Sequence, residues 1–462
     1  MLEKIVNIVN DIVWSPALVV LLVAAGLYFT IRTRCVQVRR LPLMVRLLFN
    51  SGNTSEGKTI SSFQAFCVAL SGRVGTGNIV GVATAIALGG PGAVFWMWII
   101  AFLGASTAFA ESTLANMYKF EHDGNQRGGP SSYILHALKS PVLAMLFSIL
   151  AIIGYGCLLV LVQANGVSTA FENSFSVPPL VSGICIAAVL GLVIIGGVKR
   201  IANVASIVTP FMAAIYILMA LVIIAVNIKE VPAMFSLIFS SAFGANQLFS
   251  GIIGSTIAMG VKRGLFSNEA GEGGGAIVSA SADVDHPAKQ GLVQAFSVYV
   301  DTLLVCTATA LMILCTGSFN VFDSEGNMIL AGAPELGKNY VSFTQTAIDS
   351  VFNGFGSIFV TIALTFFAFT TIMAYYFYAE SSFFYIFHRR KVTGGKNEKI
   401  ILNIYRVLMM VLVVTGACTA SDTVWKIGDI GVGLTTWINI IALLILFPKA
   451  LESLKDLEKK IH

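Results

Sequence analysis

Long runs of apolar residues without a single charge recur along this chain. A helix that crosses a bilayer needs about 20 largely apolar residues, so each run of that length predicts one crossing. The periodicity within the runs is helical and lacks the strict alternation of a membrane barrel. Seven charge-free runs have a suitable length: Ile12–Ile31, Ser140–Phe171, Asn173–Val198, Ile201–Ile228, Val231–Val261, Ser350–Ala379 and Ile430–Pro448.

Four further crossings come from less regular stretches. The apolar run from Val74 to Ala110 is too long for one helix, and Gly89-Gly90-Pro91-Gly92 interrupts it with a strong turn signal. We therefore predict two helices there. Two weaker spans follow, Leu292–Thr316, which contains Asp301, and Ile400–Ala420, which contains Arg406. The sequence thus predicts an all-α integral membrane protein with eleven transmembrane helices.

The composition supports this class and excludes others. Hydrophobic residues make up 56% of the 462 residues and charged residues only 11%, whereas soluble domains carry roughly 25% charge. A water-soluble fold, disorder and nucleic-acid binding are therefore excluded. The net charge of +5 is better explained by where the basic residues lie than by an acidic partner.

The basic residues predict the orientation in the membrane. If the N-terminus lies outside, 25 of the 29 Lys and Arg fall in cytoplasmic segments, as the positive-inside rule requires. This count includes Arg73 at the start of its helix and the loop from Lys262 to Lys289. An odd number of spans then places the C-terminus in the cytoplasm. The tail carries Leu451, Leu454, Leu457 and Ile461 at helical spacing, which predicts an amphipathic helix on the inner membrane surface.

Residues that would favour catalysis or a resident metal are scarce. The seven cysteines form no CxxC pair, and the five histidines fall in predicted cytoplasmic segments without metal-ligand spacing. A membrane-embedded enzyme would need a histidine, a metal cluster or an acid–base pair within its spans, so we predict no enzyme. A channel would need a continuous polar stripe or a charged ring, and only isolated intramembrane charges occur. Gly271-Glu272-Gly273-Gly274-Gly275 lacks the ending of a phosphate loop and is interpreted as a flexible cytoplasmic hinge.

Two segments look unsuitable for continuous helices. The first runs from Ser71 to Gly81 and the second from Phe249 to Ser255, continuing to Gly264. Glycine costs about 1 kcal/mol per helical position relative to alanine, so both segments favour unwinding, although close GxxxG-type packing is the alternative. The breaks fall in the second and seventh spans, five apart. Matched breaks of this kind indicate a transporter with a midplane site, built from inverted repeats.

This positional argument divides the chain into four parts. Residues 1–58 would form an extra N-terminal transmembrane helix and a linker, and residues 59–228 a first five-helix repeat. Residues 229–449 would form the second, inverted repeat, and residues 450–462 the cytoplasmic tail. The predicted architecture is therefore one extra helix plus a five-plus-five inverted repeat with broken helices.

Several motifs resemble the sodium:alanine/glycine symporter family. The run Gly75-Thr76-Gly77-Asn78-Ile79-Val80-Gly81 is similar to that family, and Gly89-Gly90-Pro91-Gly92-Ala93-Val94-Phe95-Trp96-Met97-Trp98 matches its signature in full. Arg263 to Gly271 and Asp301-Thr302 look like the same family. The chain departs from it at Glu272-Gly273-Gly274-Gly275, where a more varied stretch is expected. The resemblance extends from about Arg34 to Pro448.

The resemblance implies a LeuT-type fold and sodium-coupled uptake of small neutral amino acids, alanine and glycine, across the plasma membrane by alternating access. Sodium would be transported and would not be a prosthetic group. The expected partners are the amino acid, sodium and the lipid bilayer, with no nucleic acid and no obligate protein partner. A proton-coupled or differently selective amino-acid carrier, with Asp301 titrating, is the alternative.

The broken helices provide candidate substrate contacts. The helix beginning after Gly75-Thr76-Gly77 presents free N–H groups to a carboxylate, with the side chains of Thr76 and Asn78 in reach. Carbonyls near Phe249-Ser250-Gly251 would face the ammonium. Gln163 would either contact the substrate or form an interhelical hydrogen bond. Phe366, with Phe367 and Phe369, would either wall the pocket or pack the bundle.

The resemblance also implies a sodium site. The eighth core helix of the LeuT-type arrangement supplies side-chain oxygens, here Thr370 and Thr371, and the first core helix supplies carbonyls, here near Gly72 to Gly75. The alternative for the Thr pair is hydrogen bonding to its own helix. Arg73, Glu111 and Asp301 are intramembrane charges, each costly unless paired or hydrated. We expect Glu111 to gate or to pair with a basic loop residue, and Asp301 to contact an ion or ammonium or to pair with Arg73.

Overall fold

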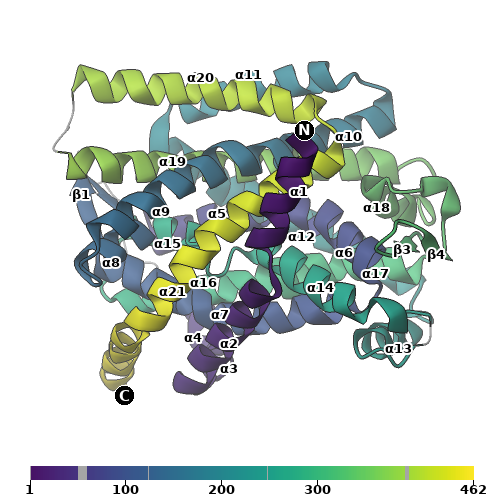
Figure 1. Ribbon diagram of the computed structural model, residues 1–462, viewed down its shortest axis with the longest axis horizontal. Helices are drawn as coiled ribbons and strands as arrows, with labels where there is room; N and C mark the ends of the chain where they lie inside the picture. Colours follow the sequence, from purple (N-terminus) through teal and green to yellow (C-terminus); the bar gives the residue numbers. More distant parts are fainter. Residues whose placement is uncertain (1, 50–59, 123, 247, 391–394, 462) are drawn as a thin grey trace.

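The computed structural model describes residues 2–49, 60–122, 124–246, 248–390 and 395–461. Within these residues the chain is helical apart from two short hairpins, which lie at opposite ends of the long axis (Figure 1). The predicted boundary at residues 58 and 59 lies outside the described residues. The hairpins pair β1 (Phe120–His122) with β2 (Asn125–Arg127) and β3 (Asn320–Phe322) with β4 (Met328–Ala331), both antiparallel.

The helices follow the predicted apolar runs. Several are interrupted or preceded by short segments, labelled η, of which η2, η3 and η5 are π-helical and η4 and η6 are 3₁₀-helical. In chain order they are α1 (Leu2–Val13), α2 (Pro16–Arg32), α3 (Val36–Arg39), α4 (Leu41–Phe49), α5 (Ser62–Arg73), η2 (Gly77–Gly81), α6 (Val82–Gly89), α7 (Ala93–Met117), α8 (Pro130–His136), α9 (Pro141–Ile153), η3 (Gly154–Leu158), α10 (Leu159–Phe175), α11 (Pro179–Ile194), α12 (Gly197–Val226), α13 (Val231–Ala242), η4 (Ser250–Ile252), α14 (Ile253–Asn268), α15 (Gly274–Ser279), α16 (Pro287–Val298), η5 (Tyr299–Cys306), α17 (Thr307–Cys315), η6 (Pro334–Leu336), α18 (Tyr340–Asp349), α19 (Gly356–Arg389), α20 (Lys396–Cys418) and α21 (Ser421–Ile461).

Among the described residues, eight helices are long and apolar enough to cross a membrane, and the bent pair α5 and η2–α6 makes a ninth. Two shorter apolar helices, α11 and α13, accompany them. The chain is therefore a multi-pass membrane protein. Exposed large apolar side chains cover the outer helices, for example Ile207 and Phe211 on α12 and Ile404 on α20, as expected for surfaces that face lipid.

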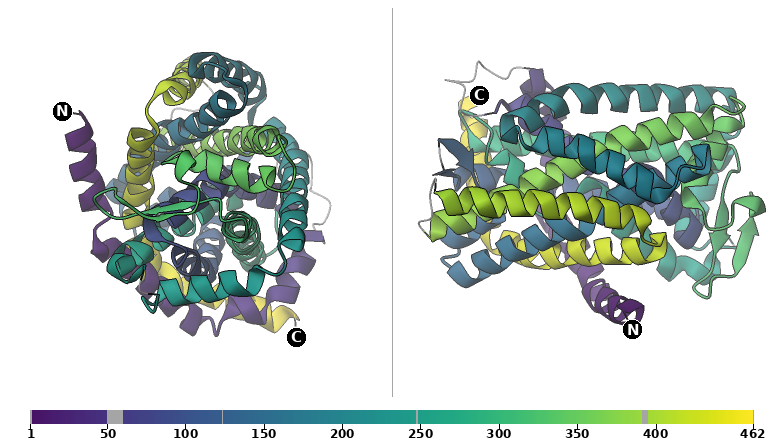
Figure 2. Two further views of the ribbon diagram at one scale, coloured as in Figure 1. Left: turned by 90° about the vertical axis from the view of Figure 1, so that its right-hand side faces the viewer. Right: turned by 90° about the horizontal axis from the view of Figure 1, so that it is seen from above.

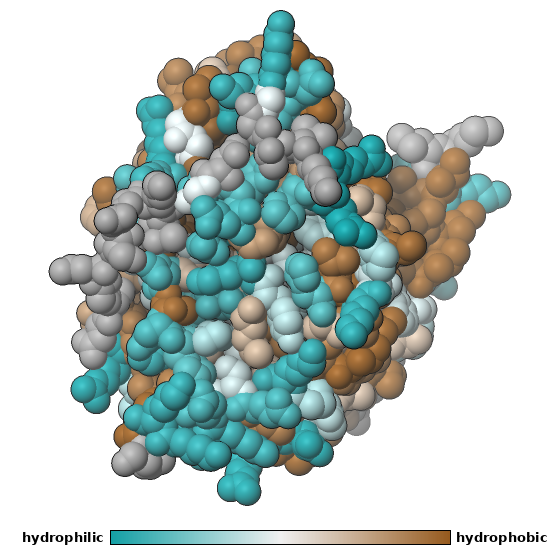
Figure 3. Space-filling view, turned by 90° about the vertical axis from the view of Figure 1, so that its left-hand side faces the viewer, coloured by the Kyte–Doolittle hydropathy of each residue, from teal (hydrophilic) through white to brown (hydrophobic). Residues whose placement is uncertain are grey.

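The long helices run roughly along the long axis of the molecule, and α11 and α20 lie side by side on one flank (Figures 1 and 2). Shorter connecting elements gather at the two ends. The end that carries β1 and α8 is hydrophilic over its centre, with apolar residues towards its rim (Figure 3). This distribution is typical of a surface that faces water between lipid-facing flanks.

The first predicted break is present, but the span around it begins earlier than expected. The Ser61 hydroxyl accepts a hydrogen bond from the Gln64 amide, and the Gln64 side chain accepts one from the Ser61 amide, which starts α5 at Ser62. The helix leaves α geometry at Val74 and bends by 50° before Gly77. Arg73 therefore lies in the middle of a broken span, and its prediction as a cytoplasmic helix start is wrong.

The turn that separates the second and third spans is confirmed. The helix α6 ends at Gly89, Gly90 adopts a φ of +71°, and α7 begins at Ala93. The backbone of Ser241 and Ala242 in α13 approaches so closely that a side chain at Gly92 would overlap it. The turn therefore needs glycine at position 90 for its backbone conformation and at position 92 for its close packing against α13.

The second break lies elsewhere than predicted. The predicted segment joins α13 to α14 only up to Ile252, and from Ile253 to Gly264 it belongs to the continuous helix α14, whereas the buried unwound segment is Glu269–Gly273, between α14 and α15. Glu269, Gly271 and Gly273 there have φ values of 53°, 97° and 99°. Gly271–Gly275, interpreted as a flexible cytoplasmic hinge, does not lie in a water-exposed loop, because residues 263–282 are all buried.

The C-terminal tail also differs from expectation. It is helical and amphipathic as predicted, but it continues α21 without interruption through Pro448. Leu454 and Leu457, both 2% exposed, pack in one cluster with Val36 and Met44. Leu451, Leu454 and Leu457 of the predicted apolar face therefore pack against protein, whereas Ile461 is exposed.

Candidate transport site

The backbone freed at the first break is held by two side-chain amides. The Gly75 N–H donates to the Asn78 Oδ1 atom at 2.8 Å. The Thr76 N–H and hydroxyl both donate to the Gln163 Oε1 atom of α10, at 3.0 and 2.9 Å. All four residues are buried. The structure thus brings together four of the residues proposed as substrate contacts, Gln163 through the interhelical hydrogen bond that was its alternative role, and Gly77 lies beside Phe266 and Ser267.

Asp301 joins the same cluster from the wide turn η5. Its carboxylate accepts hydrogen bonds from Asn78 at 2.6 Å, from Ser267 at 2.9 and 3.1 Å and from Thr302 at 2.7 Å. Pairing with Arg73, one of the two alternatives for Asp301, does not occur. The Arg73 guanidinium instead donates to the Gln294 Oε1 atom at 3.3 Å and to the Ser297 hydroxyl.

Oxygen atoms converge where α19 meets the break in α5. The Thr371 hydroxyl donates to the carbonyls of Ser71 at 2.7 Å and Val74 at 3.2 Å, and to Phe367 at 2.9 Å on its own helix. The Thr370 hydroxyl donates to the carbonyls of Phe366 and Phe367, both at 3.0 Å on its own helix, which is the hydrogen bonding given above as the alternative for the Thr pair. The facing carbonyls thus belong to Ser71 and Val74, because the chain leaves helical geometry after Arg73. Those of Gly72 and Gly75 make no hydrogen bond to either hydroxyl, although Gly75 packs against Thr371.

Four predicted contacts lie away from this cluster. Ser250 and Gly251 are exposed and Phe249 packs against Gly90, at the far end of α6 from Gly75. The reason is that α14 begins at Ile253, so Phe249, Ser250 and Gly251 precede the helix and the rest of the region predicted as unwound is helical. Phe366 is 41% exposed on the outer face of α19, and Phe367 is the ring that turns inward.

Glu111 is buried in α7, but its observed partner differs from the one expected. Its Oε2 atom accepts from the Asn439 amide of α21 at 2.9 Å, and the same amide donates to the Gly271 carbonyl. The hydrogen bond therefore ties Glu111 to the second unwound segment and not to a basic loop residue.

Sequence reasoning missed the inner end of α14. Ser267 contacts both Asp301 and the first break, and Glu269 accepts from the Tyr378 hydroxyl at 3.2 Å. Their signal was the glycine density of residues 271–275, which matches that of the first break. This second break was missed because no long apolar run crosses these residues, so they were assigned to a cytoplasmic loop.

A buried ion pair and two aromatic rings close one side of the cluster. Arg263 and Lys262 of α14 lie 2.6 and 2.7 Å from Asp429 of α21. The Arg263 guanidinium also stacks 4.8 Å from the Trp425 ring, which packs 5.0 Å from Phe266. Lys262 and Arg263 were predicted in a cytoplasmic loop, but they belong to helix α14. Arg73 likewise belongs to a helix, α5.

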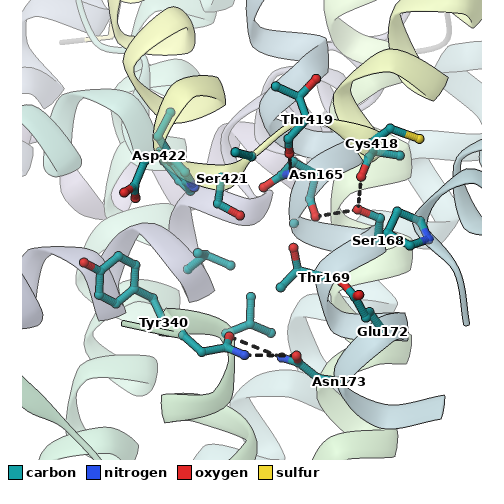
Figure 4. Close-up of a pocket in the computed structure, with 18 of the residues that line it drawn as sticks. Asn165, Ser168, Thr169, Glu172, Asn173, Tyr340, Cys418, Thr419, Ser421 and Asp422 are labelled. Carbon is teal, nitrogen blue, oxygen red and sulfur yellow. Dashed lines mark hydrogen bonds between the residues drawn. The ribbon is translucent and has the colours of Figure 1, made fainter. Parts of the chain in front are cut away.

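Beyond Trp425 a polar cavity of about 590 Å³ opens towards the end that carries β3 and β4. Its walls come from α10, α18 and the turn between α20 and α21, and include Glu172, Asn173, Tyr340 and Asp422 (Figure 4). Val80 of η2 and Gly166 of α10 also line it. Because Gly166 packs against the Thr76 side chain, the cavity ends next to the first break.

Discontinuous helices around a buried polar cluster, within a multi-pass bundle, define a membrane transporter of the broken-helix class. The fold agrees with this class: the crystal structure of MhsT in complex with L-phenylalanine aligns with a TM-score of 0.54 at 15% identity, covering 86% of this chain and all of that one. The model of the sodium:alanine symporter family matches residues 1–462. The chain belongs to that family.

Curated relatives align along nearly their whole length. The sodium/proton-dependent alanine carrier protein of Bacillus sp. (strain PS3) is 47% identical over 420 residues, which cover 90% of this chain and 92% of the relative. The sodium/alanine symporter AgcS of Methanococcus maripaludis is 39% identical over 453 residues, covering 96% and 94%. The resemblance predicted from the sequence motifs is thus confirmed.

Proposed function

We propose that this protein takes up small neutral amino acids, alanine and glycine, together with sodium by alternating access. One observation carries the proposal: the Thr371 hydroxyl of α19 lies within 3.2 Å of two carbonyls freed by the break in α5. In broken-helix transporters such carbonyls coordinate sodium. The names of the relatives from strain PS3 and Methanococcus maripaludis support the same ion and substrate.

The sodium ligands in this proposal are all neutral oxygens. The carbonyls of Ser71, Val74 and Phe367 would contribute together with the hydroxyls of Thr370 and Thr371. Hydroxyl groups rotate, so each can turn from donating to a carbonyl to accepting the cation. Sodium bound there would hold α19 against the broken helix. It would also link ion binding to substrate binding, because Val74, a proposed sodium ligand, directly precedes the proposed carboxylate contacts Gly75 and Thr76.

The substrate carboxylate would bind at the N–H groups of Gly75 and Thr76, near the positive end of η2. In the structure these groups donate to Asn78 and Gln163, whose amides would exchange partners when a carboxylate arrives. Asp301 and Ser267 on the other side of Asn78 suit an ammonium group. The close packing of Gly75, Gly77 and Gly166 leaves room only for a small side chain.

The polar cavity of Figure 4 would be the outer entrance to this site. Its carboxylates and its lysine (Glu172, Asp422 and Lys338) carry both signs of charge, which suits a zwitterion. Trp425, with Phe266 and the Arg263–Asp429 pair, would separate the entrance from the binding cluster.

We further infer eleven crossings arranged as one extra helix and a five-plus-five inverted repeat. Adding α11 and the broken α14–α15 pair to the nine candidate spans gives this number. The extra helix is α1–α2, the first repeat runs from α5 to α12, and the second begins with α13–α15. Each repeat would then start with a broken helix.

In this arrangement the N-terminus lies outside and the C-terminus in the cytoplasm. The polar end in Figure 3 would face the cytoplasm and the β3–β4 end would face outward. Of the 25 basic residues assigned to the inside, Arg73 and Arg263 are buried within helices in the described part of the chain, and Lys262 beside them is half-buried. The charge bias therefore persists.

Transport by purified protein in liposomes tests the proposal. An inward sodium gradient should concentrate radiolabelled alanine, and replacing external sodium by choline should abolish the accumulation. Uptake that persists without sodium would contradict the proposal. We assign the protein no catalytic activity and no obligate protein partner.

Proton coupling is the second candidate function. It is favoured by a buried acid, Asp301, which is hydrogen-bonded to Asn78 in the binding cluster, and by the sodium/proton-dependent activity named for the strain PS3 relative. Accumulation driven by a pH gradient in sodium-free liposomes would support it. A carrier that needs both ions would respond to either gradient.

A further inference from the structure

Three carboxylates meet at the second unwound segment and are not used by the transport site described above. Glu269 and Glu272 belong to the segment itself, and Glu111 reaches it from α7. They are 1%, 1% and 0% exposed. One oxygen of each, Oε1, has no hydrogen-bond partner among the described residues. A buried acid with an unsatisfied oxygen is costly when it is ionised.

The positive charge near these acids does not balance them. Arg73 attracts all three, but its hydrogen bonds go to Gln294 and Ser297. Its Nε and Nη2 atoms have no partner among the described residues. Three acids facing one guanidinium leave two negative charges in excess if all are ionised. In a low-dielectric interior such an excess is relieved by binding protons or a cation.

A second unsatisfied group points into the same space. The Tyr155 hydroxyl of η3 is fully buried and has no hydrogen-bond partner in the described part of the chain. Its ring lies 5.0 Å from Tyr378 and 5.7 Å from Tyr375, and it interacts electrostatically with Glu272 and Glu269. The hydroxyl would donate to an ionised carboxylate and would accept from a protonated one, so it suits a site that changes its protonation state.

The geometry favours a proton over a metal ion. No group of three His, Cys, Asp or Glu side chains converges as a metal site within the described ranges. Glu111 already accepts from Asn439 and Glu269 from Tyr378, whereas no side-chain hydrogen bond of Glu272 occurs among the described residues. Glu272 also stands between Gly271 and Gly273, whose φ values of 97° and 99° allow the backbone to rearrange. It is therefore the acid whose surroundings can change most.

We propose that Glu272, with Glu111 as its neighbour across the unwound segment, binds the proton that accompanies alanine during transport. This inference rests on the proposed function. A proton from water adds to the Glu272 carboxylate during inward transport and returns to water in the cytoplasm, with no change in electron count. Its neutralisation relieves repulsion from Glu111 and Glu269, and so lets α15 settle against α5 and α19. Asp301 remains a hydrogen-bond acceptor in the substrate cluster.

The charged and titratable groups around Glu272 come from every element packed on the segment. They are Glu269 on the segment, Arg73 on α5, Glu111 on α7, Tyr133 on α8, Tyr155 on η3, Asp301 on η5, Tyr375 and Tyr378 on α19, and Asp429 on α21. Of these, Asp429 is paired with Arg263 and Lys262. Glu111, Glu269 and Glu272 share the charge of Arg73, so the first proton neutralises one of three mutually repelling carboxylates and breaks no hydrogen-bonded ion pair.

The test compares Glu272→Gln with the unmodified full chain in liposomes that contain a pH-sensitive dye. With equal sodium on both sides, external alanine should acidify the lumen for the unmodified protein. The half-saturating alanine concentration should change with pH, by at most about tenfold per unit for one linked proton. Glu272→Gln should abolish the acidification and flatten the pH dependence while sodium-driven uptake continues. Unchanged acidification and pH dependence in this variant would overturn the proposal.

Controls separate this proposal from the proposed function and from misfolding. Glu452→Gln removes an exposed acid of α21 and should behave like the unmodified chain. If the unmodified chain shows no sodium-driven uptake, the proposed function itself fails. If it shows uptake without acidification, only the proton site fails. Should Glu272→Gln not fold, Glu111→Gln decides instead, because the loss of its charge should shift the pH dependence, and an unchanged profile would overturn the proposal.

Discussion

Residues far apart in the sequence meet at single atoms in this protein. Thr371 and Ser71 are 300 positions apart, yet a hydroxyl and a carbonyl lie 2.7 Å from each other. The two threonines were predicted as ion ligands from their place in the eighth core helix. The carbonyls that face Thr371 belong to Ser71 and Val74, each one residue before the predicted Gly72 and Gly75, because the sequence shows where glycine permits unwinding but not which carbonyl then turns towards a neighbouring helix.

Thr371→Ala should raise the half-saturating sodium concentration by about tenfold, because an oxygen contact to a charged group contributes about 1.5 kcal/mol. Thr371→Ser keeps the hydroxyl and should restore most of the affinity. Thr365→Ala is the matched control, since its hydroxyl bonds only to Thr361 on the same helix. Sodium dependence of alanine uptake measures the effect, and an unchanged value for Thr371→Ala would remove this residue from the ion site.

Gly75→Val should block alanine transport while the protein stays folded. A Cβ atom at Gly75 would lie 2.6 Å from the Thr371 hydroxyl and 2.7 Å from the Gln163 Oε1 atom, so added methyl groups would fill the binding cluster. Gly254→Val is the control, because nothing lies within 4 Å of a Cβ at that position. Normal uptake by Gly75→Val at native thermal stability would show that the carboxylate binds elsewhere.

At the scale of elements, the two broken helices carry the site, and their predictability differed. The first break lies inside a long apolar run, so its glycines stand out. The second, Glu269–Gly273, is polar and buried. Its polar and glycine residues led to its interpretation as a flexible cytoplasmic hinge. Burial of such a segment depends on α5, α7 and α19 packing around it, which no local pattern encodes.

Gly273→Ala should lower the melting temperature of the purified protein and slow transport. Its φ of 99° costs an L residue about 1–2 kcal/mol, and its Cβ would also press against Pro130 and Phe147. Gly317→Ala adds the same kind of backbone strain at a φ of 67° but meets nothing within 4 Å. A larger loss for Gly273→Ala than for this control, measured by thermal unfolding in detergent, is the expected result, and equal losses would contradict it.

At the scale of the whole molecule, the apolar flanks and the two polar ends set the protein in a bilayer. The charged residues that line the proposed entrance are Glu172, Lys338 and Asp422. In our proposal Trp425 and Phe266 separate them from the sodium ligands. In the proposed alternating access, Trp425 of α21 would move relative to Phe266 of α14 and to the break in α5, with the unwound segments as the flexible points.

Single-cysteine variants test the proposed orientation. Cys35 and Cys418 are both exposed, and they lie on opposite sides of the proposed membrane. With the other six cysteines replaced, a membrane-impermeant thiol reagent added to intact cells should label Cys418 and leave Cys35 unlabelled until the membrane is opened. The reverse pattern would invert the topology.

The sequence by itself determined the membrane class, the spacing of most spans, the turn at Gly89–Gly92 and the first break, because hydrophobic length and glycine content act locally. The family motifs added the identity of the ion and of the substrate class. Only the tertiary structure decided which carbonyls face Thr371, that Asp301 bonds to Asn78 and not to Arg73, and that the glycine-rich stretch after α14 is buried. These contacts depend on how helices cross in space, and residues hundreds of positions apart set them jointly.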